Sequence, residues 1–334
     1  MNKTFIIAEV AQAHDGSLGI AHSFIDALKN SGVDAIKFQT HIAEAESSQY
    51  EPFRINFSYK DKTRFDYWKR MEFSYDEWKG LKDHCEEIGV EFMSSPFSNA
   101  AVDLLEKIGV KRYKVGSGEV NNFLLLEKIA RTKKPVIISS GMSSFKEIEE
   151  AVNFLKYFGY NRNNLTVMQC SSEYPTSCEN IGLNVIDQLR QKYDFPIGYS
   201  DHSGKIYPII AAVARGAKVV EFHITFDKRM FGPDASSSLT IDETKEVVKA
   251  IRCIENSDVN KNDIYKYKNM KKIFEKSLCV NTDLKKGDVI TFDVLDAKKP
   301  ANYGISAKNY KNVIGKKLKK NLKAWEFLRI EDIE

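Results

Sequence analysis

The stretch AKVVEFHI at 217–224 is a short β-branched run that decides how the rest of the chain is interpreted. Side chains point to opposite faces along a strand, so Glu221 and His223 share one face while Phe222 lies on the other. The apolar face belongs against helices, which directs Glu221 and His223 into the interior of a closed sheet. The run therefore predicts a barrel strand with ionisable residues at its carboxyl end.

Seven similar runs precede this one and alternate with amphipathic helical patterns. They lie at 4–9, 34–39, 90–95, 111–116, 135–140, 165–170 and 195–200. The helical patterns lie near 20–31, 75–88, 99–108, 122–131, 144–158, 180–192, 206–215 and 240–254. Eight strand–helix units in about 250 residues predict an α/β fold, a (β/α)8 TIM barrel. An open doubly wound sheet is the alternative, but no glycine fingerprint follows the first strand.

Two further features concern the organisation of the chain. We expect a barrel domain over 1–255, a polar linker over 256–272 and a small β-rich domain over 273–334, with short strands at 277–280 and 289–290. The connection after the second strand, which runs from Thr40 to about Asp76, is rich in aromatic residues and too long for a plain βα loop. Long ordered loops are commonly functional, so we expect it on the rim of the active site.

Composition limits the classes of partner and the compartment. The five cysteines form no CxxC pair, which argues against a disulfide framework or a thiolate zinc site. The apolar runs are too short to cross a bilayer and no signal-like segment opens the chain, so we expect a cytoplasmic protein without a membrane partner. Residues 256–334 hold 18 lysines and arginines against 11 acidic residues, but no nucleic-acid motif accompanies them. We expect no nucleic acid, and a basic lid that favours anionic substrates is one use of this excess.

Two histidines follow neighbouring strands of the predicted barrel. His202 and His223 are separated by one helix and one strand, and adjacent strands lie roughly 4.8 Å apart. Both imidazoles are then close enough to bind one divalent cation, with Glu9, Glu221 and Asp234 nearby. Nitrogen and oxygen donors of this kind suit Mn²⁺ or Mg²⁺. The alternative is that the histidines are hydrogen-bonded structural groups.

Two lysines face the same interior. Buried cations need partners, so Lys37 and Lys114 either bind an anionic ligand or pair with acids such as Glu9 and Glu119. A Schiff-base lysine is a third possibility. Hydroxyl groups at other strand ends favour a cradle for phosphate and carboxylate, and they come from Ser95, Ser139 and Ser200.

A collinear series of motifs resembles the N-acetylneuraminate (sialic acid) synthase family, which includes legionaminate and pseudaminate synthases. In the predicted barrel the matching segments are IIAEVAQAHDGSL (6–18), VDAIKFQT (33–40), SSPFS (94–98), YKVGSGEVNN (113–122), SSGMS (139–143), CSSEYPT (170–176), IGYSDHSG (197–204), EFHITFD (221–227) and FGPD (231–234). The tail is similar to the family's antifreeze-like (SAF) domain in KSLCVNTDLKKGDVITFDVL (276–295), KKPANYGIS (298–306) and VIGKKL (313–318).

The resemblance implies condensation of phosphoenolpyruvate (PEP) with the open-chain aldehyde of an N-acylated hexosamine, which yields a nonulosonic acid and phosphate. It also implies a homodimer whose swapped C-terminal domains cap the partner's barrel. The substrate-binding residues it implies are Lys37, Gln39, Ser95, Lys114, Ser117, Ser139, Tyr174, Ser200 and Lys299. Catalytic roles go to Glu9, Glu119 and Asp234. The metal ligands it implies are His202 and His223, with Mn²⁺ or Mg²⁺ as the cofactor.

Some positions depart from the family pattern, and these leave the acceptor sugar open. Ser172 replaces an amide that helps bind phosphate, and Lys299 replaces an arginine that contacts the N-acyl group. Lysine lacks the planar fork of a guanidinium. Three other functions remain: a synthase for another 3-deoxy-2-ulosonic acid, a metal-independent lysine aldolase, and a non-catalytic carbohydrate- or ice-binding protein.

Overall fold

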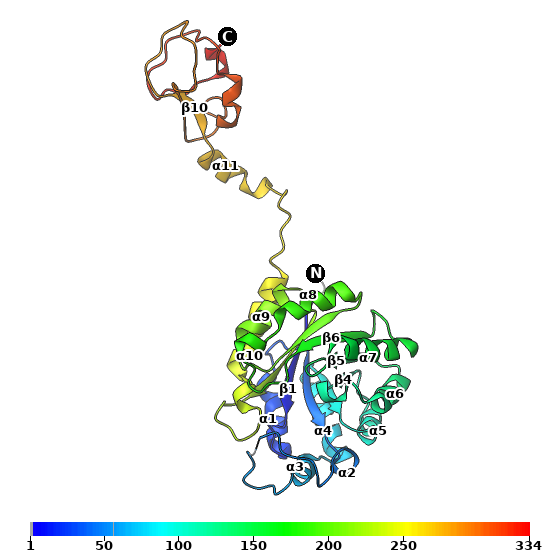
Figure 1. The fold of residues 1–334 in the computed structure, drawn as a ribbon. Coiled ribbons are helices and arrows are strands. Elements are labelled where there is room, and N and C mark those ends of the chain that lie inside the picture. Colours follow the sequence, from blue (N-terminus) through cyan, green and yellow to red (C-terminus); the bar gives the residue numbers. More distant parts are fainter. Residues whose placement is uncertain (1–2, 56) are drawn as a thin grey trace. The chain divides into compact units, whose positions relative to one another are not determined.

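Eight parallel strands form the centre of the N-terminal unit (Figure 1). They are β1 (Phe5–Ala11), β2 (Ala35–Thr40), β3 (Glu91–Pro96), β4 (Tyr113–Val115), β5 (Val136–Ser139), β6 (Leu165–Cys170), β7 (Ile197–Asp201) and β8 (Val219–Thr225). Hydrogen-bonded neighbours follow the order β3-β2-β1-β8-β7-β6-β5-β4, and the two end strands contact each other. The sheet is a nearly closed barrel, which confirms the predicted TIM architecture.

The computed structural model describes residues 3–334 except residue 56. It divides the chain into one unit that ends at Ser257 and a second over Asp258–Glu334. Figure 1 shows helices around the barrel strands of the first unit. These helices are α1 (Leu18–Leu28), α4 (Tyr75–Glu87), α5 (Asn99–Ile108), α6 (Phe123–Arg131), α7 (Phe145–Tyr157), α8 (Leu183–Lys192), α9 (Ile206–Ala214) and α10 (Ile241–Glu255).

Strand parity places apolar and polar side chains as predicted. Phe222 and Ile224 are buried in the core between the strands and the surrounding helices. Val219, on the opposite face, packs in a separate small cluster that fills the barrel interior; it also contains Ile7, Ala35, Met93, Ile137 and Met168. Glu221 and His223 continue this inner face toward the carboxyl end of β8. This apolar cluster therefore fills the bottom of the barrel, and the polar side chains at the carboxyl ends of the strands face a cavity above it.

The connection between β2 and α4 is not one long loop. It contains α2 (Ala43–Glu46) and α3 (Arg64–Met71), which the sequence pattern did not predict. Thr63 and Asp66 form a capping box that starts α3, because each side chain accepts a hydrogen bond from the other residue's backbone N–H. Tyr67 and Trp68 of α3 then pack in a satellite apolar cluster with Ala43. These contacts give the connection a core of its own.

The second unit is built around a small β structure. Strand β10 (Ser277–Val280) pairs antiparallel with β11 (Leu295–Lys298) over a core that includes Leu278, Val280, Ile290 and Leu328. The strand expected at 289–290 is wrong, because Val289 forms only an isolated bridge to Lys317. The predicted linker over 256–272 contains part of a helix, α11 (Lys268–Phe274). In the first unit, the short strand β9 (Leu239–Thr240) pairs with β8. Among the described residues, no helix is both long and apolar enough to span a membrane.

Candidate active site

A cavity of about 480 Å³ opens at the carboxyl ends of the barrel strands. Its lining includes every site residue expected from the sequence except Lys299: Glu9, Lys37, Gln39, Ser95, Lys114, Ser117, Glu119, Ser139, Tyr174, Ser200, His202, His223 and Asp234. Lys299 belongs to the second unit, where its ammonium lies 4.6 Å from the ring centroid of Phe274. The barrel strands thus bring together residues that are up to 225 positions apart.

Four buried charged groups form the inner wall of the cavity. Lys37 Nζ lies 2.7 Å from Glu9 Oε2 and 3.7 Å from Glu221 Oε1. Lys114 Nζ lies 3.3 Å from the same oxygen of Glu221. Glu221 is therefore the shared counter-ion of the two lysines, rather than Glu119. The strand register explains the first of these pairs, since Glu9 is directly opposite Lys37 in the β1–β2 ladder.

The two carboxyl groups of this wall differ in their surroundings. Burial raises the pKa of Glu9 to about 7, with Lys37 opposing the shift and Glu221 adding to it. Burial would also raise the pKa of Glu221, but Lys114 and Lys37 outweigh it and hold the pKa at about 2. Two cations next to one carboxylate and one next to the other account for the difference. Glu221 is a permanent anion, and Glu9 is the carboxyl group that can exchange a proton near neutral pH.

Hydroxyl groups complete the inner wall. Lys37 Nζ donates to Ser95 Oγ at 3.1 Å, and Ser200 Oγ donates to Glu221 Oε1 at 3.3 Å. The Gly141 N–H donates to Ser117 Oγ at 3.0 Å. Ser139 Oγ is buried and has no hydrogen-bond partner among the residues that the structure describes. Buried hydroxyls of this kind next to lysines can donate to an anion.

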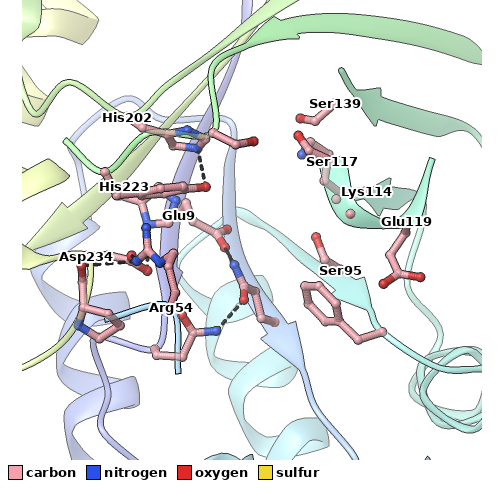
Figure 2. A pocket seen from close by; sticks show the side chains of 18 of the residues that line it. Glu9, Arg54, Ser95, Lys114, Ser117, Glu119, Ser139, His202, His223 and Asp234 are labelled. Carbon is pink, nitrogen blue, oxygen red and sulfur yellow. Dashed lines mark hydrogen bonds and ion pairs between the residues drawn. The ribbon is translucent and has the colours of Figure 1, made fainter. Parts of the chain in front are cut away.

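The two predicted metal-binding histidines lie side by side. Their ring centroids are 5.2 Å apart with an interplanar angle of 70°. His202 Nδ1 donates to the carbonyl of Ser171 at 2.6 Å, and the Tyr174 hydroxyl lies 3.1 Å from His202 Nε2. His223 Nδ1 is buried, has no hydrogen-bond partner within the described part of the chain, and lies 3.8 Å from Asp234 Oδ2. Figure 2 shows His202, His223 and Asp234 on one side of the cavity, opposite Ser117, Lys114 and Ser139.

The donor set fits a divalent cation that keeps open coordination positions. Burial, followed by the nearby His202, lowers the pKa of His223 far below its usual range, so its imidazole is neutral, as a ligand must be. Burial lowers the pKa of His202, but Cys170 and the Ser171 carbonyl outweigh it and raise the pKa to about 9. His202 is therefore protonated near neutral pH, and a cation would bind its ring only in place of a proton. No group of three His, Cys, Asp or Glu that could hold a metal ion is found within residues 3–334 without residue 56, so a cation held by the two histidines would take its other ligands from water or substrate.

Comparison with known proteins shows the family to which this architecture belongs. The NeuB family model matches residues 24–263, and the SAF domain model matches residues 275–334. The chain belongs to the NeuB family. It is an enzyme of a family of synthases, with the SAF domain at its C-terminal end.

Relatives of this NeuB-family chain act in sugar-acid biosynthesis according to their names. The chain is 37% identical over 335 residues to the N,N'-diacetyllegionaminic acid synthase of Campylobacter jejuni subsp. jejuni serotype O:2, covering 98% of this chain and 100% of that protein. It is 35% identical to the N-acetylneuraminate-9-phosphate synthase of Homo sapiens, covering 94% of this chain and 88% of that protein. The solved N-acetylneuraminic acid synthetase of Leptospira borgpetersenii serovar Hardjo-bovis aligns with a TM-score of 0.71 and 32% identity, over 80% of this chain and 90% of that one.

The NeuB-family cavity also has an outer wall that sequence reasoning missed. Arg54, from the β2–α4 connection, lies 4.2 Å over the ring of Tyr174 and donates to Asp234 Oδ1 at 2.7 Å (Figure 2). Arg64 lies 4.3 Å over the ring of Trp68. An arginine far from any strand end carries no periodic signal, and the only available hint was the unusual length of the connection.

Proposed function

We propose that this chain condenses PEP with the open-chain aldehyde of an N-acylated hexosamine, giving a nonulosonic acid and inorganic phosphate. The observation that carries the proposal is the pair of buried lysines, Lys37 and Lys114, which face the same cavity as the two histidines. The named relatives include synthases of N,N'-diacetyllegionaminic acid and of N-acetylneuraminate 9-phosphate, which supports the same class of product here.

The inner wall supplies the binding site for PEP. Lys114 has three ammonium donors, and its ion pair is with Glu221 at 3.3 Å. The remaining donors can bind a phosphate or carboxylate oxygen. The unpartnered Ser139 hydroxyl lies in the same lining. Charge-assisted bonds of this type are about twice as strong as neutral ones, so the lysines determine the affinity for a multiply charged anion.

The condensation makes one carbon–carbon bond and breaks one carbon–oxygen bond. C3 of PEP attacks the aldehyde carbon, and the aldehyde oxygen takes up a proton to become a hydroxyl. Water adds at C2. The bond between C2 and the phosphate oxygen breaks as the water oxygen becomes the 2-keto group, and one of the two water protons leaves with phosphate. The other proton passes to a carboxylate and balances the proton taken up by the aldehyde oxygen. Glu9 is the group we assign to hold that proton, because its Oε2 lies 2.7 Å from Lys37 Nζ at the centre of the cavity.

The histidines and the outer wall position the acceptor. His202 and His223 would hold Mn²⁺ or Mg²⁺, which as a Lewis acid supplies polarisation of a carbonyl oxygen. Tyr174 and Asp234 are the side chains between the histidines and Arg54, so we assign them to the hydroxyl groups of the sugar. Glu119, whose Oε2 accepts from Asn122 Nδ2 at 2.7 Å, lines the opposite side and is assigned to the same substrate.

We also propose a homodimer in which each SAF unit covers the partner's cavity and presents Lys299 to the sugar. The charge balance supports it, because residues 256–334 carry 18 cationic against 11 acidic residues, whereas residues 1–255 carry 32 against 35. Light scattering measures the mass of the full chain directly. Removal of residues 258–334 should raise the KM for the sugar while the KM for PEP changes little.

The reaction is tested with a panel of aldehydes. Purified full-length protein receives Mn²⁺ and PEP with N-acetylmannosamine, a 2,4-diacetamido-6-deoxyhexose or arabinose 5-phosphate, and phosphate release is followed. We expect release only with an amino sugar. Release with arabinose 5-phosphate alone would indicate a different ulosonic acid, and release with none of them would contradict the proposal. Borohydride trapping in the same samples detects a Schiff base, which the proposal excludes.

A further inference from the structure

A buried histidine of the β2–α4 connection has no role in the proposed reaction. His41 is 2% exposed and is stacked between Trp68 and Phe97, with ring centroids 3.9 Å and 4.6 Å from its own. Both of its nitrogens have polar neighbours, so the stacking fixes the ring plane and the polar contacts fix its rotation. The His41 ring is therefore held in one orientation, and it is part of the cavity lining.

The polar contacts of His41 continue to the catalytic carboxylate. His41 Nδ1 lies 2.6 Å from Glu46 Oε1, and its Nε2 lies 2.9 Å from Gln12 Nε2. Gln12 Nε2 also donates to Gln39 Oε1. Gln39 Nε2 donates to Glu9 Oε1 at 2.9 Å. An uninterrupted path of hydrogen bonds therefore runs from Glu46 to Glu9.

The direction of every bond in this path follows from the ionised Glu9. A carboxylate only accepts, so the amide nitrogen of Gln39 must face Glu9 and its oxygen must face Gln12. The amide nitrogen of Gln12 then donates to Gln39 and also lies against His41 Nε2. Gln12 Nε2, at 2.9 Å, is closer to His41 Nε2 than Gln39 Oε1 is, at 3.3 Å, and an amide nitrogen cannot accept, so the geometry favours His41 Nε2 as the unprotonated nitrogen. The proton of neutral His41 is then on Nδ1, where Glu46 accepts it.

We propose that Glu46, His41, Gln12 and Gln39 form a positioning relay that fixes the Glu9 carboxylate for proton transfer. The inference rests on the role of Glu9 in the proposed function. Gln39 holds Oε1 and Lys37 holds Oε2, so neither oxygen is free to rotate away from the reacting carbon. Loss of the relay frees Gln39 to flip, and its oxygen would then face Glu9 and repel it. Gln39 acts through Glu9 in this scheme, in addition to the sugar contact expected for it.

The first test does not need activity. The protein is labelled with ¹⁵N-histidine, and the two ring nitrogens of His41 are assigned by loss of their signals in His41→Phe. At a pH well above 7, where Glu9 is ionised, the relay predicts a neutral ring with a protonated Nδ1 and an unprotonated Nε2. A proton on Nε2, in either the neutral or the charged ring, would overturn the proposal. Failure of the proposed reaction does not affect this measurement.

The second test measures the effect on turnover. His41→Phe retains an aromatic ring between Trp68 and Phe97 but removes both nitrogens. We expect kcat to fall about 10- to 100-fold, because small displacements of a catalytic group have effects of this size, while the KM for PEP stays within about twofold. Glu46→Gln still offers an oxygen to Nδ1 and should lose less than Glu46→Leu. The matched control is His84→Phe, since His84 lies in α4 and bonds His22 and Asp26.

A double variant separates positioning from general loosening of the connection. Gln39→Leu breaks the relay next to Glu9, so adding His41→Phe to it should lower kcat no further. Additive losses would show that His41 acts by another route and would overturn the relay. An unchanged kcat in His41→Phe would overturn it as well. If the wild-type protein turns over no sugar, the proposed function fails, and the nitrogen signals alone decide the relay.

Discussion

The inner and outer walls of the cavity are held in place by different means. The inner wall, which consists of Glu9, Lys37, Lys114 and Glu221, stands on barrel strands, where the ladder fixes the position of each residue. The outer wall, which consists of Arg54 and Arg64, stands on the connection after β2, where no ladder determines position. Arg54 instead reaches Asp234, 180 positions along the chain. Groups on strands are positioned precisely enough for bond making, whereas a connection can vary with the substrate.

This difference predicts which substitutions affect chemistry and which affect sugar choice. Inner-wall changes should lower kcat/KM with every acceptor, because they act on PEP and on the reacting carbon. Outer-wall changes should alter the KM for the sugar and leave the binding of PEP largely intact. The following substitutions are ordered by the size of the expected effect.

Lys114→Met should have the largest effect. It removes a cation from the PEP site and leaves Glu221 with only the more distant Lys37, at 3.7 Å. We expect kcat/KM for PEP to fall on the order of 10²- to 10³-fold, as for the loss of one charge-stabilising donor. Steady-state phosphate release gives the value, and thermal melting shows whether the fold persists. Lys128→Met is the matched control, since Lys128 pairs with Asp103 on the helical layer. A fall in kcat/KM below about threefold would show that Lys114 does not contribute to binding PEP.

His223→Ala should weaken metal binding. The substitution removes a neutral imidazole whose Nδ1 has no hydrogen-bond partner among the described residues, so none of them is left unsatisfied. We expect about 100-fold weaker Mn²⁺ binding by calorimetry and a matching rise in the Mn²⁺ needed for half-maximal activity. His22→Ala, on α1, serves as the histidine control. Unchanged Mn²⁺ affinity in His223→Ala would contradict the two-histidine site.

Arg54→Met should act mainly on the sugar. It removes the guanidinium that stacks on Tyr174 and donates to Asp234, and the apolar replacement retains part of the packing. We expect the KM for the sugar to rise about 10-fold, equal to 1.4 kcal/mol, with the KM for PEP within about twofold. A fall in kcat/KM for PEP as large as that expected for Lys114→Met would show that the two walls do not differ in function.

Tyr59→Ser should have the smallest effect. Tyr59 is on the connection but is 99% exposed. We expect the free energy of unfolding to change by less than about 0.5 kcal/mol and both KM values to remain the same. A clear rise in the KM for the sugar would extend the outer wall to the tip of the connection.

The same contrast explains what could be predicted from the sequence. Alternation with a period of two residues located the strands, and the same alternation correctly predicted that Lys37, His223 and Glu221 face the inside of the barrel. Glu221 was expected near the metal ligands but pairs with both lysines, because its two cationic neighbours come from strands distant in sequence. Parity fixes the face of a side chain, not its partner.

The features that the sequence did not predict lie where hydrophobic periodicity is absent. The short helices α2 and α3, Arg54 and the His41 contacts depend on tertiary packing within the connection, which no local pattern encodes. In the second unit, β11 reads LDAK, without the β-branched residues that mark a strand. The bridge of Val289 to Lys317 likewise depends on a long-range contact.

The most direct test is a crystal structure of the full chain with Mn²⁺ and PEP. The account predicts phosphate or carboxylate oxygens about 2.7–2.9 Å from Lys114 Nζ, and the cation on the rings of His202 and His223. Ordered PEP bound to Arg54 and Arg64 of the outer wall, with Lys114 still paired only to Glu221, would contradict it.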